Sequence, residues 1–170
     1  MGSPHLPTTT YRIRSCSAAT NSALEHRISM PLIREEDAAL IRERLEPMVN
    51  PVRLLHFTQE LNLALGAETL QLLKELAGLS DKLSLEVVDF LLDKAKVREY
   101  AVDNVPATVI RNGKDYGIRF YGVPAGYEFS ALLDAILAVS KGDSGLLSSS
   151  REKLAQLAQP LHLEVFVTPT

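Results

Sequence analysis

The chain has 170 residues, of which 46% are hydrophobic and 23% are charged, a composition typical of a folded globular protein. Its net charge of −3 at pH 7 argues against a protein built to coat nucleic acid or an anionic membrane surface. The single cysteine, Cys16, excludes an intrachain disulfide and a cysteine-based zinc site. No apolar stretch approaches the about eighteen residues that cross a bilayer. We therefore expect a cytoplasmic protein that binds neither nucleic acid nor membrane.

The first segment of the chain differs in composition from the rest. Residues 1–29 are rich in Ser, Thr and Ala, and they show no sustained apolar period. The apolar run that a secretory signal needs is also missing there. We expect residues 1–29 to be a disordered leader or extension, and we expect the native start at Met30.

A strand–helix–strand unit follows a first helix. Apolar residues recur at helical spacing over 33–48, and Pro47 ends that run. Residues 52–57 and 83–90 have the mostly apolar character of buried strands. The leucines between them mark one face of a long helix over 62–79. A helix of this length between two strands predicts that the strands are parallel.

A second half of the sheet is predicted from a hairpin signal. A short helix is expected over 93–100. Residues 107–110 and 114–121 flank Asn112-Gly113, a pair typical of a type I′ turn in which both residues have positive φ. Another amphipathic helix spans 129–137. The order predicts an α/β fold of the thioredoxin-like kind, with a mixed four-stranded sheet and helices on both faces.

The carboxyl-terminal part indicates a second unit. The Gly- and Ser-rich segment 143–150 is typical of a linker, and Ser149 and Glu152 match a capping box for a helix over 151–158. A strand is expected over 162–167. We therefore expect a thioredoxin-like unit over 30–142, a linker over 143–150, and the first helix and strand of a truncated second unit over 151–170.

Four segments carry a resemblance to a known family. They are Asn50-Pro51-Val52-Arg53-Leu54, Leu83 to Phe90, Val105-Pro106-Ala107-Thr108 and, most specifically, Tyr116 to Phe129. From Met30 onward the chain resembles the amino-terminal half of the glutaredoxin-like protein disulfide oxidoreductases, which contain two thioredoxin-like units. It is also similar to the amino-terminal domain of the flavoprotein component of alkyl hydroperoxide reductase. The resemblance implies a glutaredoxin-like fold.

The chain departs from this family where the family carries its chemistry. Typical members begin the helix after the first strand with Cys-x-x-Cys, and here Leu63, Ala64, Leu65 and Gly66 take the equivalent positions. The second Cys-x-x-Cys of the family follows a strand that resembles 165–170, and this chain stops one residue short of it. Disulfide exchange needs one thiolate to attack and a second thiol to resolve the mixed disulfide. No catalytic residue is therefore predicted.

The remaining candidates concern substrate binding and metal binding. Val105 and Pro106 match the position of the family's cis-proline, which implies contact with a substrate peptide; the alternative is that Pro106 only shapes the turn into the next strand. His56 and His162 have no partners at metal-ligand spacing, and each is expected to be a satisfied or solvent-facing histidine. We expect no metal and no cofactor.

Three hypotheses of function follow from the residues and the resemblance. The first is a redox-inactive thioredoxin-fold unit that acts as a scaffold, or docks substrate, for a thiol-active second unit. The second is that the full-length protein is a dithiol–disulfide oxidoreductase that acts in redox homeostasis through a Cys-x-x-Cys after Thr170. The third is a standalone peptide-binding module. Expected partners are a protein or peptide substrate, or a thioredoxin reductase-like partner of the full-length protein; the sequence leaves oligomerisation open.

Overall fold

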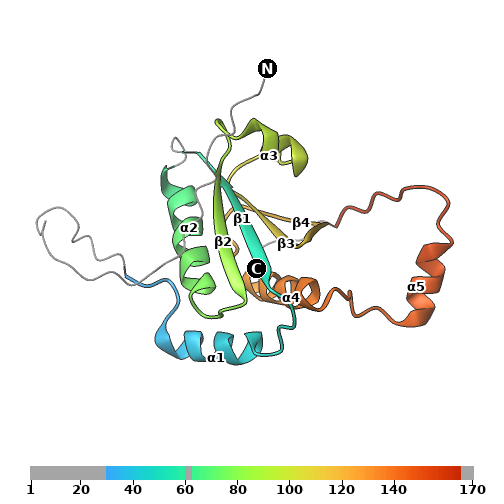
Figure 1. Ribbon diagram of the computed structural model, residues 1–170, viewed down its shortest axis with the longest axis horizontal. Coiled ribbons are helices and arrows are strands. Elements are labelled where there is room, and N and C mark those ends of the chain that lie inside the picture. Colours follow the sequence, from blue (N-terminus) through green and yellow to red (C-terminus); the bar gives the residue numbers. More distant parts are fainter. Residues whose placement is uncertain (1–29, 60–62, 166–170) are drawn as a thin grey trace, which may run out of the picture.

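The computed structural model describes residues 30–59 and 63–165, and its helices and strands alternate along the chain (Figure 1). In chain order the elements are α1 (Glu35–Leu45), β1 (Val52–Thr58), α2 (Leu63–Ala77), β2 (Leu83–Asp89), α3 (Lys94–Glu99), β3 (Ala107–Asn112), β4 (Lys114–Tyr121), α4 (Tyr127–Lys141) and α5 (Ser148–Ala155). The expectation of a disordered leader over 1–29 lies outside the described residues. The division of the chain into two units also stays a prediction.

The strands form one mixed four-stranded sheet in the order β2-β1-β3-β4. β1 pairs with β2 in parallel, and β3 pairs with both β1 and β4 antiparallel. This arrangement confirms the predicted strand–helix–strand unit and the predicted hairpin. Because β1 and β3 are the central strands, their side chains are the most deeply buried of the sheet.

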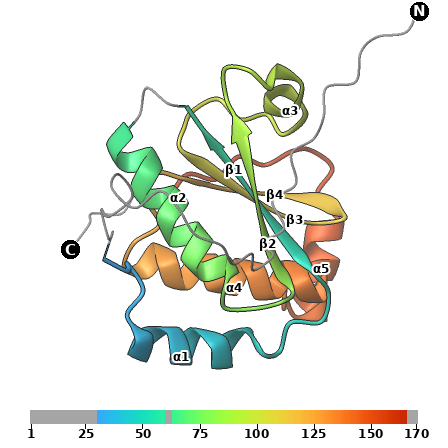
Figure 2. The same ribbon diagram turned by 60° about the vertical axis from the view of Figure 1, so that its left-hand side comes forward.

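Two apolar cores lie on opposite faces of the sheet. On one face Leu54 and Ile110 pack with side chains of α1, α2 and α4, among them Leu73 and Leu132. On the other face Leu55, Phe57 and Val109 pack with Tyr100, Val102 and, from α3, Val97. The two sets alternate along β1, because successive side chains of a strand point to opposite faces. Figure 2 shows α2 and α4 beside each other and α3 across the strands from α2, which confirms helices on both faces.

The turn of the hairpin differs from the predicted type I′ turn. Asn112 pairs with Lys114 across the hairpin, and Gly113 between them has φ +65°. Outside glycine, Ala101 is the residue of the described chain that has positive φ, so Asn112 does not. The pairing of β3 and β4 is also irregular between Val109 and Arg111. The dipeptide therefore predicted the position of the turn but not its conformation.

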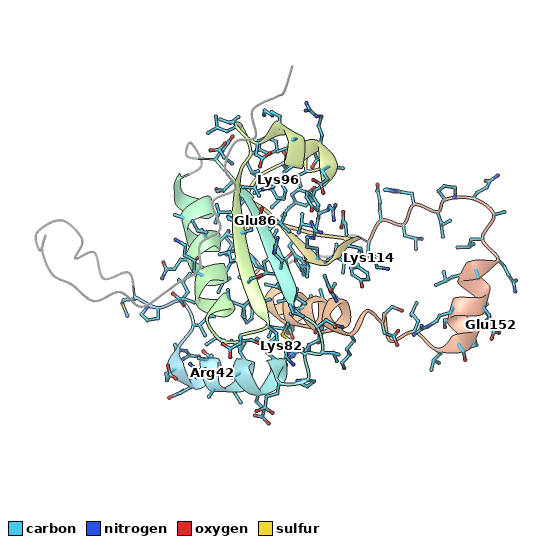
Figure 3. The ribbon with its side chains drawn as sticks, in the orientation of Figure 1. Arg42, Lys82, Glu86, Lys96, Lys114 and Glu152 are labelled. Carbon is cyan, nitrogen blue, oxygen red and sulfur yellow. The ribbon has the colours of Figure 1, made fainter. Side chains whose placement is uncertain are left out.

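The carboxyl-terminal part differs most from the expectations. α5 begins at Ser148, inside the expected linker, with Leu147 as its N-cap residue and no side-chain cap, so the predicted capping box of Ser149 and Glu152 does not form. Residues 161–165 form no strand, which contradicts the predicted strand over its described part, 162–165. α5 stands apart from the sheet (Figure 1), and Glu152 on it is labelled in Figure 3. Since α5 has no buried residue, no packing decides its boundaries.

Within the described ranges, none of the helices is both long enough and apolar enough to cross a membrane.

Candidate functional site

The predicted degenerate positions lie at the beginning of α2. Leu63, Ala64 and Leu65 form its first turn, α2 is the next element after β1, and Gly66 follows as a buried residue. The side chains of the first three lie outside the described part of the structure. The structure therefore places these four residues at the helix start that the sequence predicted.

The second predicted position, Val105–Pro106, lies in the segment that leads into β3. Its peptide bond is cis, and Pro106 is buried. The Pro106 carbonyl accepts a hydrogen bond from the backbone N–H of Gly122 at 2.9 Å, where β4 has just ended. The Thr69 hydroxyl of α2 donates to the Gly122 carbonyl at 3.5 Å. Gly122 thus links the Pro106 segment to α2, and the fold brings the two predicted positions into one region.

His56 on β1 lies between these two positions. Its side chain is completely buried, and its Nδ1 lies 3.4 Å from the hydroxyl of Thr108, its register partner on β3. Its Nε2 has no hydrogen-bond partner among the described residues. The alternative of a solvent-facing His56 is therefore wrong, and of the two ring nitrogens Nδ1 has a partner of hydrogen-bond geometry. The mostly apolar run predicted a buried strand here, but it could not predict which groups surround the ring.

The environment keeps the His56 ring neutral. Burial lowers the pKa of His56 from 6.5 to about 4, because a charged imidazole would lose its hydration. The backbone groups of Gly66 and Ala107 raise the pKa by smaller amounts. These two groups belong to the beginning of α2 and to the residue after Pro106. Because the ring interacts with both groups, it lies beneath the start of α2 and beside the Val105–Pro106 segment.

The packing of α2 against the end of β1 brings residue 66 close to the Thr58 side chain. A Cβ atom on Gly66 would lie 2.9 Å from Oγ1 of Thr58, closer than ordinary van der Waals contact. Thr58 is β-branched, so its χ1 angle is restricted. A side chain at position 66, including that of a cysteine, would require Thr58 to move.

The polar groups of this region are the His56 imidazole and the hydroxyls of Thr58, Thr69 and Thr108. A neutral imidazole with a free ring nitrogen can hold or accept a proton, whereas dithiol exchange needs two thiols. The one cysteine of the chain, Cys16, lies outside the described residues. In the part of the chain that the structure describes, no group of three or more His, Cys, Asp or Glu side chains could hold a metal ion.

A groove of about 670 Å³ runs beside this region, between α1, α2, the loop before α4, and α4 itself. Leu40, Leu72 and Phe129 give it an apolar lining. Arg44 on its rim donates to Asp134 at 2.7 Å. Sequence reasoning missed the groove. Helical periodicity predicts which face of each helix is apolar, but not the gap that remains between three packed helices.

The strand order, the helices on both faces and the Pro106 segment beside the start of α2 define a thioredoxin-like domain. Solved structures confirm this class. The crystal structure of the amino-terminal domain of the alkyl hydroperoxide reductase AhpF from Enterococcus faecalis matches with a TM-score of 0.65 and 25% identity, over 71% of this chain and 59% of that chain. A protein disulfide oxidoreductase from Aeropyrum pernix matches with a TM-score of 0.65 and 31% identity, over 74% of this chain and 55% of that chain.

Sequence comparison leads to the same relatives. The alkyl hydroperoxide reductase protein AhpF of Staphylococcus epidermidis is 34% identical over 98 residues, which cover 54% of this chain. The AhpF protein of Staphylococcus aureus is 31% identical over 104 residues, which cover 61% of this chain. The matched part spans about a fifth of the length of these curated relatives. No protein-family model matches the chain. The predicted resemblance to both groups of proteins is thereby confirmed, and the chain is a thioredoxin-fold domain related to redox proteins.

Proposed function

We propose that this chain is a thioredoxin-fold unit that carries out no thiol–disulfide exchange of its own, and that it serves as a scaffold for a thiol-active second unit. The observation that carries the proposal is the close packing of Gly66 on Thr58 at the start of α2. An exchanging dithiol needs an accessible thiolate and a resolving thiol close to it. Here Gly66 of α2 packs on Thr58 of β1, so a side chain at residue 66 would require Thr58 to move.

Two roles were open for such a unit, namely scaffold and substrate docking at Val105 and Pro106. The Pro106 carbonyl accepts a hydrogen bond from Gly122, which holds the Pro106 segment against the end of β4. This contact gives Pro106 a structural role of the kind a scaffold needs, and docking at Val105 stays the alternative. The solved relatives support the idea of a larger protein, because the match covers 55–59% of their chains.

Reduction of insulin disulfides in the presence of dithiothreitol tests the proposal. We expect the chain to leave the uncatalysed rate unchanged, while a thioredoxin at equal concentration accelerates it. The matched control is Cys16→Ser, which removes the only thiol and should behave like the parent chain. Acceleration by the parent chain that disappears in Cys16→Ser would show that this unit has thiol chemistry, and would refute the proposal.

A second candidate concerns the whole protein. The 31% identity to a protein disulfide oxidoreductase favours a dithiol–disulfide oxidoreductase that acts through a Cys-x-x-Cys after Thr170, reduced by a thioredoxin reductase-like partner. Sequencing the gene beyond codon 170 and assaying its complete product tests this candidate. We expect a cysteine pair and insulin reduction by the complete product; a complete product without a cysteine pair contradicts this candidate and leaves the first proposal to the assay above.

A further inference from the structure

A second, smaller hollow lies at the opposite end of the sheet from the α2 site. It has a volume of about 300 Å³, and its lining includes Pro51, Arg53, Ser84, Arg111 and Gly113. These residues surround the beginning of β1 and the end of β3, whereas the α2 site lies where β1 ends and β3 begins. The hollow is therefore separate from the region of Gly66 and Pro106.

Two arginines from adjacent strands line this hollow. Arg53 on β1 and Arg111 on β3 are direct register partners in an antiparallel pair. Directly opposed residues share a face of the sheet and lie about 5 Å apart at their Cα atoms. Like charges in this arrangement repel each other and destabilise the pair. Ser84, the parallel partner of Arg53 on β2, adds a hydroxyl to the same row.

The nearby carboxylates of Glu86 and Asp115 balance the positive charges of Arg53 and Arg111 only in part. Glu86 accepts from Arg53 at 3.3 Å but also from Lys96 at 2.7 Å, so two cations share one carboxylate (Glu86 and Lys96 are labelled in Figure 3). On the other side Asp115, the register partner of Arg111 on β4, is engaged by Arg119 at 2.5 and 2.8 Å.

Arg111 makes its contacts with neutral groups. It donates to the Tyr100 hydroxyl and, at 2.9 Å, to the Gly113 carbonyl, and its guanidinium lies 5.7 Å from the centre of the Tyr100 ring. Within the described residues Arg111 has no carboxylate oxygen within ion-pair distance, and no carboxylate lines the hollow. Asp115 is the carboxylate nearest to it in the register, and the pKa of Asp115 is lowered chiefly by its hydrogen bonds from Arg119 and, to a smaller extent, by the charge of Arg111. The hydroxyl and the carbonyl orient the guanidinium, and Asp115, which Arg119 holds by direct hydrogen bonds, balances its charge only in part.

We propose that the Arg53–Arg111 hollow binds a small oxyanion of the phosphate class, either inorganic phosphate or the phosphate group of a small phosphate monoester. Guanidinium groups present planar forks of N–H donors that match two oxygens of a phosphate. Two such forks from adjacent strands can hold one tetrahedral anion between them, and its charge offsets their repulsion. The volume lies at the low end of the about 300–1000 Å³ typical of ligand sites, which suits a small anion.

Titration with inorganic phosphate at constant ionic strength tests this proposal, with backbone amide NMR shifts as the readout. We expect saturable shifts centred on Ser84 and Gly113, and none when chloride replaces phosphate. Arg53→Gln and Arg111→Gln should each weaken binding about tenfold, since each removes one charged fork. Arg111→Lys should bind with intermediate affinity, because it keeps the charge and loses the fork.

Arg42→Gln on α1 (Arg42 is labelled in Figure 3) is the matched control, because it changes the net charge equally and Arg42 does not line the hollow. It should bind phosphate like the parent chain. Arg53 is 57% exposed, so Arg53→Gln preserves the fold even if Arg111→Gln does not. Absence of saturable shifts, unchanged affinity in Arg53→Gln, or an equal loss in Arg42→Gln would overturn the proposal. A titration with glycerol 3-phosphate then distinguishes an ester-binding site from one that takes only the free ion.

Discussion

His56 of β1 is completely buried beneath the start of α2, and its Nε2 has no hydrogen-bond partner among the described residues. An unsatisfied buried polar atom costs free energy, and natural proteins retain few of them. The cost is limited here because the ring stays neutral, as its lowered pKa requires. The residue therefore makes the stability of the fold depend on pH.

The folded protein should lose stability as the pH falls from 6.5 to 4. Over this range the unfolded chain binds a proton at His56 and the folded chain does not, because its pKa is about 4. The unfolding free energy should fall by about 3 kcal/mol in total, and below the folded pKa the loss from His56 should stop. Urea unfolding at a series of pH values measures this.

Two variants separate His56 from other titrating groups. His56→Leu removes the ring and should flatten the pH dependence between 6.5 and 4. His162→Gln is the control, since His162 is exposed and pairs with Glu164 at 2.8 Å; it should retain the full dependence. A pH dependence in His56→Leu as steep as in the parent chain would show that other groups cause it.

Gly66 and Thr58 form the second residue-scale feature, and a double-mutant cycle tests it. Gly66→Ala should lower the unfolding free energy by about 1–3 kcal/mol, because the new methyl group overlaps Thr58 Oγ1. Thr58→Ala should make Gly66→Ala less costly, or even favourable, since alanine stabilises a helix interior by up to about 1 kcal/mol over glycine. Additive effects of the two substitutions would contradict the contact.

At the scale of elements, α4 and α5 show how the packing of a helix decides how much it contributes to the stability of the fold. α4 buries Leu132, Leu133, Ile136 and Val139, and at its end the buried hydroxyl of Ser140 donates to the Asn50 carbonyl at 2.7 Å. α5 buries no residue. The side-chain hydrogen bonds of α5 are local: Arg151 donates to the Asp143 carboxylate and to the Leu146 carbonyl.

The segment after Gly142 should therefore contribute almost nothing to the stability of the thioredoxin-like part. A chain shortened to residues 1–142 should unfold within about 0.5 kcal/mol of the 170-residue chain, because surface changes away from a core have effects of this size. Ile136→Ala in both chains is the positive control and should cost about 2–5 kcal/mol, since Ile136 is fully buried. A loss of more than about 1 kcal/mol on shortening would reveal packing by the removed segment.

At the scale of the whole molecule, the sheet separates two chemically different ends. At the end where β1 stops, a neutral imidazole and threonine hydroxyls lie beneath α2. At the end where β1 begins, two arginines face a small hollow. The central strands connect the two ends and carry one apolar core on each face of the sheet, so both ends are held by the same packed framework.

The sequence alone was sufficient for most of the architecture up to Lys141. Apolar periodicity and turn residues depend on neighbours within a few positions, which is why the helices and strands from Glu35 to Lys141 were predicted in the right order. The same local reasoning failed after Gly142, where the capping-box and strand patterns were present but no core stabilises them. It also failed for the turn at Asn112, which does not have the positive φ of a type I′ turn.

What the sequence by itself determined is the thioredoxin-like order of elements, the positions of the two apolar faces and the lack of a second thiol, because these follow from residue type and short-range spacing. Only the tertiary structure decided that His56 lies beneath Gly66, that Thr58 fills the space beside it, and that Arg53 faces Arg111. Each of these pairs depends on helix packing or on the register of strands far apart in the chain. A shift of one residue in that register would move these side chains to opposite faces of the sheet.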